Sequence, residues 1–420
     1  MKKLKEIYRS DFIANTLIGI FIKGVTFSVS YLLISPYLIR TLGEGQFGLI
    51  TFSAGFVSLF FPFVEYGFML TAPRDLSTCQ GKLPEMGKII SNVIAVKVLL
   101  GTICFVLACF LIAFHKRLAS NANLHFFSLS LLWGQVIIPM WLYQGINQLK
   151  KFALHNFFVS IAYLAYIVFF IKSPDDYMYV NLGQGILWIV FYLISTLQVI
   201  YPLRKYLRFS WEGIWEELQK GFFIFLTNFF HYLFITLNVV ILGFFVEGKE
   251  LDNYSYAEKI YMIFRIGLGV VYQMAYPKVF LLKQKSEKEA NKFLLKLFSV
   301  MFIGFGIVST LLFWQSELII QIFTGASNAK ASELLRILSF SVLVYALSVP
   351  ISQKILIFYS SKVFSLILFL VVFFNVACNL YTIPLYGAKG TAISLLFTEI
   401  FFLTLSSIYV FTVQNKSKNE

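Results

Sequence analysis

Several ionisable side chains lie inside long apolar stretches of the sequence, where a charge needs a chemical reason. Lys23, Glu65 and Arg265 have apolar residues on both sides, and so do His231 and Glu399. A charged side chain at the centre of a bilayer costs about 2.5–3.5 kcal/mol even on the mildest scale, so such residues usually bind, pair or transfer charge. Arginine forms bidentate pairs with phosphate oxygens, and lysine adds a point charge. The excess of cations therefore indicates a site for an anionic solute.

Two of the cations belong to stripes of residues with helical spacing. The stripe around Lys23 and the stripe around Arg265 both advance by three or four residues at a time. Their members are Asn15, Gly19, Lys23, Thr26 and Ser30 in the first, and Tyr261, Arg265, Gly269, Tyr272 and Tyr276 in the second. Tyrosine offers a flat face to a sugar ring and a hydroxyl for hydrogen bonds. A cationic, tyrosine-lined interior suits an anionic solute that carries sugars.

Three further groups are candidates for coupling transport to an ion gradient. Glu65 and Glu399 are acids whose protonation would depend on burial and on nearby cations such as Lys23. His231 is an alternative, because the unperturbed pKa of histidine is about 6.5. Plainer interpretations remain open: Glu65 could form a structural ion pair with Lys23 or Arg265, and His231 could simply hydrogen-bond a neighbouring helix.

Other polar residues also allow two interpretations. Lys97 is a candidate substrate ligand, but it lies near the start of its span and could extend its ammonium group to the inner surface. Arg336 lies close to the outer end of its span, which favours a side chain that extends its guanidinium group to the outer membrane surface. Asn375 and Asn379 are four residues apart and are expected to hydrogen-bond between helices.

The composition places these residues in a membrane. Of the 420 residues, 58% are hydrophobic and 13% are charged, whereas soluble domains are about 45–50% apolar and about 25% charged. The net charge of +14 is spread over short clusters between apolar runs, so no nucleic-acid partner is expected. Cys79, Cys104, Cys109 and Cys378 show no metal-ligand spacing, and we expect neither a metal nor a cofactor.

The sequence lacks the common motifs for nucleotide binding and for hydrolytic catalysis. It contains no GxxxxGK(S/T), HExxH or GxSxG pattern, and no long loop that would form a catalytic domain outside the membrane. These features predict a transporter rather than an enzyme.

Twelve stretches are long enough to cross a bilayer as helices, at about 20 residues per span. They are residues 12–38, 47–72, 89–114, 124–147, 153–171, 178–201, 221–246, 255–280, 293–314, 334–357, 363–384 and 389–413. Lysine and arginine are concentrated on the side of the N-terminus, which indicates that this side is cytoplasmic. An even number of spans then places both termini in the cytoplasm. The predicted class is an all-α membrane protein with twelve transmembrane helices.

A polar connection near the midpoint predicts two halves of six spans, a common transporter plan. We predict an N-terminal bundle at residues 1–203, a cytoplasmic amphipathic connector at 204–220 and a C-terminal bundle at 221–420. Within the connector, Trp211, Ile214, Trp215 and Leu218 recur with the spacing of one face of an interfacial helix.

Four stretches resemble the O-antigen flippase family, Wzx, within the MATE-like exporter superfamily. They are "RTLGEGQFGLI" at 40–50, "EYGFMLTAPRDLS" at 65–77, "NYSYAEKIYMIF" at 253–264 with "YPKV" at 276–279, and "YGAKGTAISLLFTEI" at 386–400. The resemblance extends over the whole length of the chain and includes the number of spans and the break at the midpoint.

The resemblance implies a fold and a substrate. The fold would be two pseudo-symmetric six-helix bundles that form a V around a central cavity. The substrate would be an undecaprenyl-diphosphate-linked oligosaccharide, moved to the outer leaflet of the bacterial inner membrane by ion-coupled alternating access. Lys23 and Arg265 match the cations that would hold the diphosphate, Arg74 matches the arginine after the second span, and Glu399 matches the acid of the last span. Membrane lipids, and polymerase and chain-length proteins of the same pathway, are the expected partners.

Three alternative functions stay open on the sequence alone. A cation-coupled multidrug exporter would share the fold. The sites of such exporters usually favour buried carboxylates, and the candidates here are few: Glu65 and Glu399. A polymerase or ligase of the same glycan pathway would need a long outer loop. A structural membrane scaffold would not need charges inside its spans.

Overall fold

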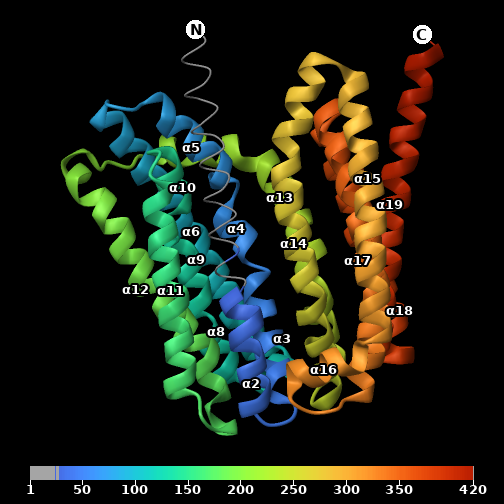
Figure 1. Cartoon of the computed structure of the whole chain (residues 1–420). Helices are drawn as coiled ribbons and strands as arrows, with labels where there is room; N and C mark the ends of the chain where they lie inside the picture. The colour runs from blue at the N-terminus through green and yellow to red at the C-terminus, as the bar shows by residue number, and fades with distance from the viewer. Residues whose placement is uncertain (1–23, 25–27, 420) are drawn as a thin grey trace. The chain divides into compact units, whose positions relative to one another are not determined.

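Every regular element in the described part of the chain is helical. The structure is a computed structural model that describes residue 24 and residues 28–419 (Figure 1). No strand occurs among these residues. The predicted all-α class is confirmed.

The chain divides into two compact units, and each is described on its own. Residues 50–232 and the described residues up to 42 form unit 1, whereas residues 43–49 and 233–420 form unit 2. The border at residue 232 lies within α13 (Trp211–Phe245), because this helix continues without a break from the connector into the following span. The predicted division at residues 204–220 stays a prediction.

Unit 1 contains long helices interrupted by short breaks. Its elements are η1 (Ser28–Ile34, a π-helix), α2 (Ser35–Thr41), α3 (Gln46–Ser58), α4 (Phe61–Glu65), α5 (Phe68–Thr78), α6 (Leu83–Phe114), α7 (Lys116–Ala119), α8 (Ala122–Ser128), α9 (Ser130–Ile137), α10 (Met140–Gly145), α11 (Leu149–Phe170), η2 (Pro174–Met178), α12 (Tyr179–Ile200), η3 (Tyr201–Tyr206) and the first part of α13. The α12 helix packs against α8, α9 and α11, and α6 packs against α4, α5 and α9.

Unit 2 consists of longer, mostly continuous helices. They are the second part of α13, α14 (Lys249–Lys285), α15 (Glu287–Trp314), α16 (Ser316–Thr324), α17 (Ala329–Phe358), α18 (Ser361–Tyr386) and α19 (Ala388–Asn419). The α17 helix lies at the centre of the unit, where it contacts α14, α15 and α19.

Ten helical runs among the described residues are long and apolar enough to cross a membrane. They correspond to ten of the twelve predicted spans; for example, α18 covers 361–386 where the sequence predicted 363–384. The predicted span 255–280 lies within α14, which is continuous but too polar to belong to the ten. The predicted span 12–38 lies largely outside the described residues. The protein is thus a multi-pass membrane protein, while the number twelve and the orientation of the termini stay predictions.

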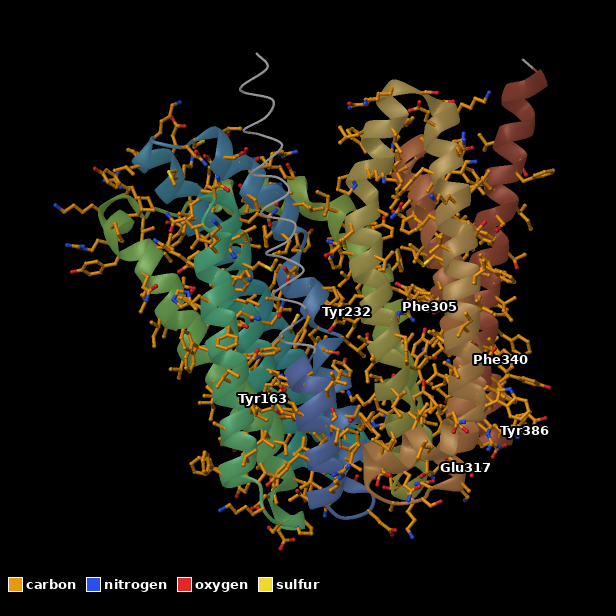
Figure 2. All side chains as sticks on the ribbon, viewed as in Figure 1. Tyr163, Tyr232, Phe305, Glu317, Phe340 and Tyr386 are labelled. Carbon is orange, nitrogen blue, oxygen red and sulfur yellow. The ribbon has the colours of Figure 1, made fainter. Side chains whose placement is uncertain are left out.

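Large apolar side chains are exposed along the long helices, as expected for surfaces that face lipid. Phe110 in α6 is 57% exposed and Phe373 in α18 is 69% exposed. Phe340 and Tyr386 of unit 2 are exposed in the same way and are labelled in Figure 2. A bilayer would cover these side chains.

Within unit 2, the glycine-rich turn at residues 43–49 packs against the first turn of α14. The amides of Gly45 and Gly48 donate hydrogen bonds to the buried carboxylate of Asp252, the latter at 2.6 Å. A Cβ atom on Gly48 would lie 2.7 Å from the backbone nitrogen of Asp252, so glycine is needed for this approach. The carboxylate caps the N-terminus of α3, where the helix dipole favours a negative charge.

Two helix breaks in unit 1 interrupt predicted membrane spans. The helix that contains Glu65 ends at Tyr66, which has a positive φ of 42°, and Gly67 follows with a φ of 85°. The second break lies at Ile138 and Pro139, between α9 and α10. Such breaks leave backbone carbonyl groups without helical partners, so nearby side chains can bind them.

Candidate functional site

A fully buried ion pair joins α14 and α19 in unit 2. Nη1 of Arg265 lies 2.9 Å from Oε1 of Glu399, and the two side chains are 4% and 0% exposed. The hydroxyl of Tyr261 donates to the same Glu399 oxygen at 3.0 Å and accepts a hydrogen bond from Arg265 at 2.9 Å. Tyr261 and Arg265 are four residues apart, so both point from one face of α14. The structure therefore brings together three of the predicted site residues.

Aromatic rings enclose the Arg265 guanidinium group. Its central carbon lies 4.7 Å from the ring centroid of Phe234 in α13 and 4.5 Å from that of Tyr345 in α17. A desolvated cation between aromatic faces gains about 2 kcal/mol or more from each good contact. These contacts help to stabilise a charge that would otherwise be costly to bury.

The ion pair does not use all of its hydrogen-bonding groups. Within the described structure, Nε and Nη2 of Arg265 and Oε2 of Glu399 are buried and have no hydrogen-bond partner. Leaving one such group unpaired costs about 1–3 kcal/mol. Nε and Nη2 form the side of the guanidinium group that binds carboxylate or phosphate in bidentate fashion. The pair can thus accept a further ligand or change its protonation state.

An amide network lies beside the ion pair and connects three helices. Oδ1 of Asn238 in α13 accepts hydrogen bonds from Asn375 and Asn379 in α18, both at 3.0 Å. Asn375 also donates to the hydroxyl of Thr398 in α19 at 3.0 Å, and Thr398 precedes Glu399. The prediction that Asn375 and Asn379 hydrogen-bond between helices is confirmed. The network fixes the part of α19 that carries Glu399.

The helix breaks of unit 1 hold a second polar cluster. Lys97 in α6 is 2% exposed, and its ammonium group donates to the carbonyl of Ile138 at 3.4 Å, directly at the Pro139 break. Glu65, at the other break, accepts a hydrogen bond from Gln135 in α9 and lies close enough to act on the Lys97 charge. The interpretation that Lys97 reaches the membrane surface is wrong, since the break supplies a buried acceptor.

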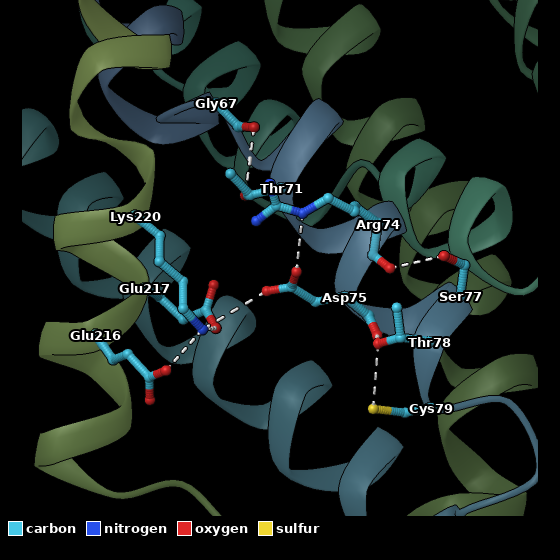
Figure 3. Close-up of polar contacts among 10 residues, drawn as sticks. All are labelled: Gly67, Thr71, Arg74, Asp75, Ser77, Thr78, Cys79, Glu216, Glu217 and Lys220. Carbon is cyan, nitrogen blue, oxygen red and sulfur yellow. Dashed lines mark hydrogen bonds and ion pairs between the residues drawn. The ribbon is translucent and has the colours of Figure 1, made fainter.

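Arg74 lies at an exposed end of unit 1 rather than in a buried cluster. Its side chain is 67% exposed, and its Nε atom lies 3.2 Å from Asp75. Figure 3 shows that Asp75 also lies opposite Lys220, which contacts Glu216 at 2.7 Å and Glu217 at 3.7 Å. Arg74 is therefore accessible to a ligand from the surface.

The carboxylates around Lys220 differ in their electrostatic environment. Burial raises the pKa of Glu217, and the nearby charges of Asp75 and Glu216 act in the same direction. The hydrogen bond from Lys220 lowers the pKa of the exposed Glu216. The pKa values of these two neighbouring glutamates are thus shifted in opposite directions.

The remaining predicted residues lie in other settings. Tyr272 is half-buried in α14, and its carbonyl accepts a hydrogen bond from Gln353 at 2.9 Å. His231 is exposed in α13. Arg336 donates to Ser316 and Glu317, both at 2.8 Å, and its side chain is 41% exposed. Lys23, and with it a contact to Glu65, lies outside the described residues.

Three residues around the ion pair were not predicted. Phe234 and Tyr345 enclose Arg265, and Glu258 is a second buried acid in α14, 4% exposed. Glu258 lies three residues before Tyr261 on the same helical stripe, so the spacing could have revealed it. No sequence signal distinguishes Phe234 or Tyr345 among the many aromatic residues of the chain.

Residues 12–280 match the family model described as "Polysaccharide biosynthesis protein". The chain belongs to this family. A protein of Shigella dysenteriae is 26% identical over 92% of this chain and 96% of its own length. A protein of Escherichia coli (strain K12) is 24% identical over 90% of this chain and 92% of its own. Both carry the name "Putative O-antigen transporter". The resemblance inferred from the sequence motifs is confirmed.

Solved structures with the same fold include two kinds of transporter. An inward-facing MATE family multidrug transporter of the MOP superfamily has a TM-score of 0.71 at 11% identity, over 93% of this chain and 96% of its own. The lipid II flippase MurJ in an inward closed conformation has a TM-score of 0.71 at 16% identity, over 95% and 87% of the two chains. These similarities establish the fold. Together with the relatives' names, they support a membrane transporter rather than an enzyme.

Proposed function

We propose that the protein is a flippase for lipid-linked glycans. It moves undecaprenyl-diphosphate-linked O-antigen or polysaccharide repeat units from the cytoplasmic to the periplasmic leaflet of the bacterial inner membrane by alternating access. The two relatives named as O-antigen transporters and the family match support this substrate class. The substrate is anionic and bears sugars, which agrees with buried cations beside tyrosine side chains.

The buried pair of Arg265 and Glu399 is the observation that carries the proposal. Glu399 and a diphosphate are both anions that can bind the guanidinium group of Arg265. Protonation of Glu399 would weaken its hold on Arg265 and leave the cation available to the substrate. Binding of the coupling ion and binding of the substrate would then both depend on this pair, so the two events would be thermodynamically coupled.

The other predicted residues have roles in the same scheme. Lys97, Arg74, Tyr261 and Tyr272 contact the diphosphate or its sugars during the cycle, and so does Lys23. Glu65 and His231 are the alternative coupling groups. The scheme places twelve spans in the membrane, six on each side of the connector at 204–220, with both termini in the cytoplasm. Polymerase and chain-length proteins of the same pathway are its proposed partners.

Reconstitution tests the substrate class. Proteoliposomes that contain the protein and a fluorescent undecaprenyl-diphosphate-linked oligosaccharide should move the glycan between leaflets, as read by its accessibility to an added glycosidase. Arg265→Lys keeps the charge but removes the planar fork, so we expect it to lower the rate at least tenfold. Transfer at the rate of protein-free vesicles would contradict the proposal.

A cation-coupled multidrug exporter is the second candidate. The MATE transporter matches the fold as well as the lipid II flippase does, with a TM-score of 0.71 for both. Glu399 would then bind the coupling cation. Transport assays distinguish the two: the reconstituted protein should move an organic cation only if the drug-exporter function is correct, and the lipid-linked glycan only if the flippase function is correct.

A further inference from the structure

The segment from η3 to the first turns of α13 carries a surface patch that neither the ion pair nor the family explains. We define it as the aromatic–basic patch: Tyr201, Arg204, Lys205, Arg208, Phe209, Trp211 and Trp215. All seven side chains are exposed. The patch lies entirely within unit 1, and its role is independent of which substrate the protein transports.

The patch is exposed although the segment that carries it is firmly packed. Ile214 is 6% exposed and belongs with Leu203 to a core cluster on α5 and α6. The amide of Ser210 donates to Oδ1 of Asn92 in α6 at 3.2 Å, and Gly213 lies tightly against the same asparagine. The helical face predicted to be apolar is therefore split, because Ile214 packs inward while the tryptophans point away.

The exposed aromatic side chains need a partner molecule that covers them. Phe209 is 66%, Trp211 74% and Trp215 63% exposed. Tryptophan is enriched where a membrane meets water, because its ring is apolar while its N–H group can hydrogen-bond. The segment directly continues two helical runs that are long and apolar enough to span a membrane, Pro174–Tyr206 and Ile224–Phe245. A segment that joins two such runs is expected at the level of the lipid headgroups.

The charge of the patch decides which headgroup it fits. Arg204 is partly engaged, since its Nη1 atom donates to the carbonyl of Tyr201 at 3.1 Å and its guanidinium carbon lies 4.1 Å from the Tyr201 ring centroid. Lys205 and Arg208 are exposed cations next to the aromatic residues. Glu212 is the one acid between Tyr201 and Trp215. We propose that this patch binds the headgroups of anionic phospholipids of the surrounding bilayer.

Brominated lipids test the proposal directly, because bromine quenches tryptophan fluorescence on contact. The full-length protein is placed in phosphatidylcholine nanodiscs that contain increasing fractions of brominated phosphatidylglycerol or brominated phosphatidylcholine. Subtracting the signal of Trp211→Phe/Trp215→Phe isolates the two tryptophans of the patch. Each cation near an anionic surface contributes about 1 kcal/mol, or about fivefold in binding. We expect phosphatidylglycerol to quench at a several-fold lower fraction than phosphatidylcholine.

Two charge variants separate the patch from general electrostatics. Lys205→Gln/Arg208→Gln should abolish the preference for phosphatidylglycerol. Lys116→Gln/Lys172→Gln removes two exposed cations elsewhere in unit 1 and should leave the preference unchanged. Equal quenching by the two lipids in the wild type, no quenching by either, or a preference that survives the first variant would each overturn the proposal. Equal quenching would indicate lipids bound without regard to charge, no quenching would indicate a protein partner, and a surviving preference would assign the lipid selectivity to cations outside the patch.

Discussion

Arg265 in α14 and Glu399 in α19 form an ion pair at 2.9 Å although 134 positions separate them in the sequence. Both side chains are buried, and three of their polar atoms lack a hydrogen-bond partner in the described structure. Breaking a buried pair is costly, whereas replacing both partners by apolar residues is often neutral. The pair is therefore a poor means of stabilising the fold, which favours a role in transport.

The first prediction concerns the stability of this pair. Arg265→Met alone and Glu399→Leu alone should each destabilise the protein by about 3–5 kcal/mol, because each leaves an uncompensated buried charge. The double variant should recover most of that loss. Thermal unfolding in detergent measures the cycle. Additive losses in the double variant would show that the two side chains do not interact in the folded protein.

The second prediction concerns the helix break after Glu65. Gly67→Ala places a Cβ atom 2.8 Å from the Ile224 side chain at a φ of 85°. Overpacking adds about 1–3 kcal/mol to a backbone strain of about 1–2 kcal/mol. Gly81→Ala is the matched control, because Gly81 has a φ of 87° but no atom within 4 Å of the added carbon. We expect the melting temperature to fall more for Gly67→Ala; equal shifts would contradict the close packing of α13 on this break.

The third prediction concerns the cap that Asp252 forms on α3. Asp252→Ala removes a charged acceptor from the amides of Gly45 and Gly48 and should cost about 1.5–3 kcal/mol. Glu44→Gln removes the partner of Lys249 in a pair whose side chains are 73% and 72% exposed, which should cost less than about 1 kcal/mol. Denaturant titration in mixed micelles compares the two variants. An Asp252→Ala loss no larger than that of Glu44→Gln would rule out the cap.

The fourth prediction concerns pH. The pKa of Glu217 is raised by burial above its usual value of 4.5, so the folded state binds its proton more tightly than the unfolded state does. Its contribution to stability is fully present below pH 4.5 and is lost as the pH rises through the raised pKa. Glu216 behaves oppositely, because the hydrogen bond from Lys220 lowers its pKa.

Melting temperatures across the acidic range test the pH prediction. Relative to the wild type, Glu217→Gln should lose less stability as the pH rises above 4.5. Glu216→Gln should instead lose less stability as the pH falls, by a small amount because this side chain is 61% exposed. Identical profiles for both variants would contradict the assigned environments.

The sequence was sufficient to locate most spans and to assign the family. Long apolar runs can only be helices in a membrane, so the predicted span 334–357 lies within α17 at 329–358. The interruptions within spans were harder to predict. Nothing in the apolar run around Tyr66 requires a non-glycine residue with positive φ. Gly221 and Ile224 of α13, which pack against this break, lie more than 150 positions further along the chain.

The individual residues of the site were predictable from the sequence, but their contacts with one another were not. The cost of burying charge identified Arg265, Glu399 and Lys97 without showing their partners. The sequence left Glu65 open as a counterion for Lys23 or Arg265, whereas Arg265 pairs with Glu399. Such pairing depends on how α14 and α19 rotate against each other, and helical periodicity within one segment carries no information on that rotation.

Gradient-driven flux through the folded double variant tests the central claim most directly. Proteoliposomes with an imposed proton or sodium gradient are loaded with the lipid-linked oligosaccharide, and its transfer is followed for the wild type and for Arg265→Met/Glu399→Leu. We predict that the wild type responds to the size and direction of one gradient, and that the double variant inserts and folds normally but has lost both the response and most of the flux. A folded double variant that transports the glycan with full dependence on the gradient would contradict the account.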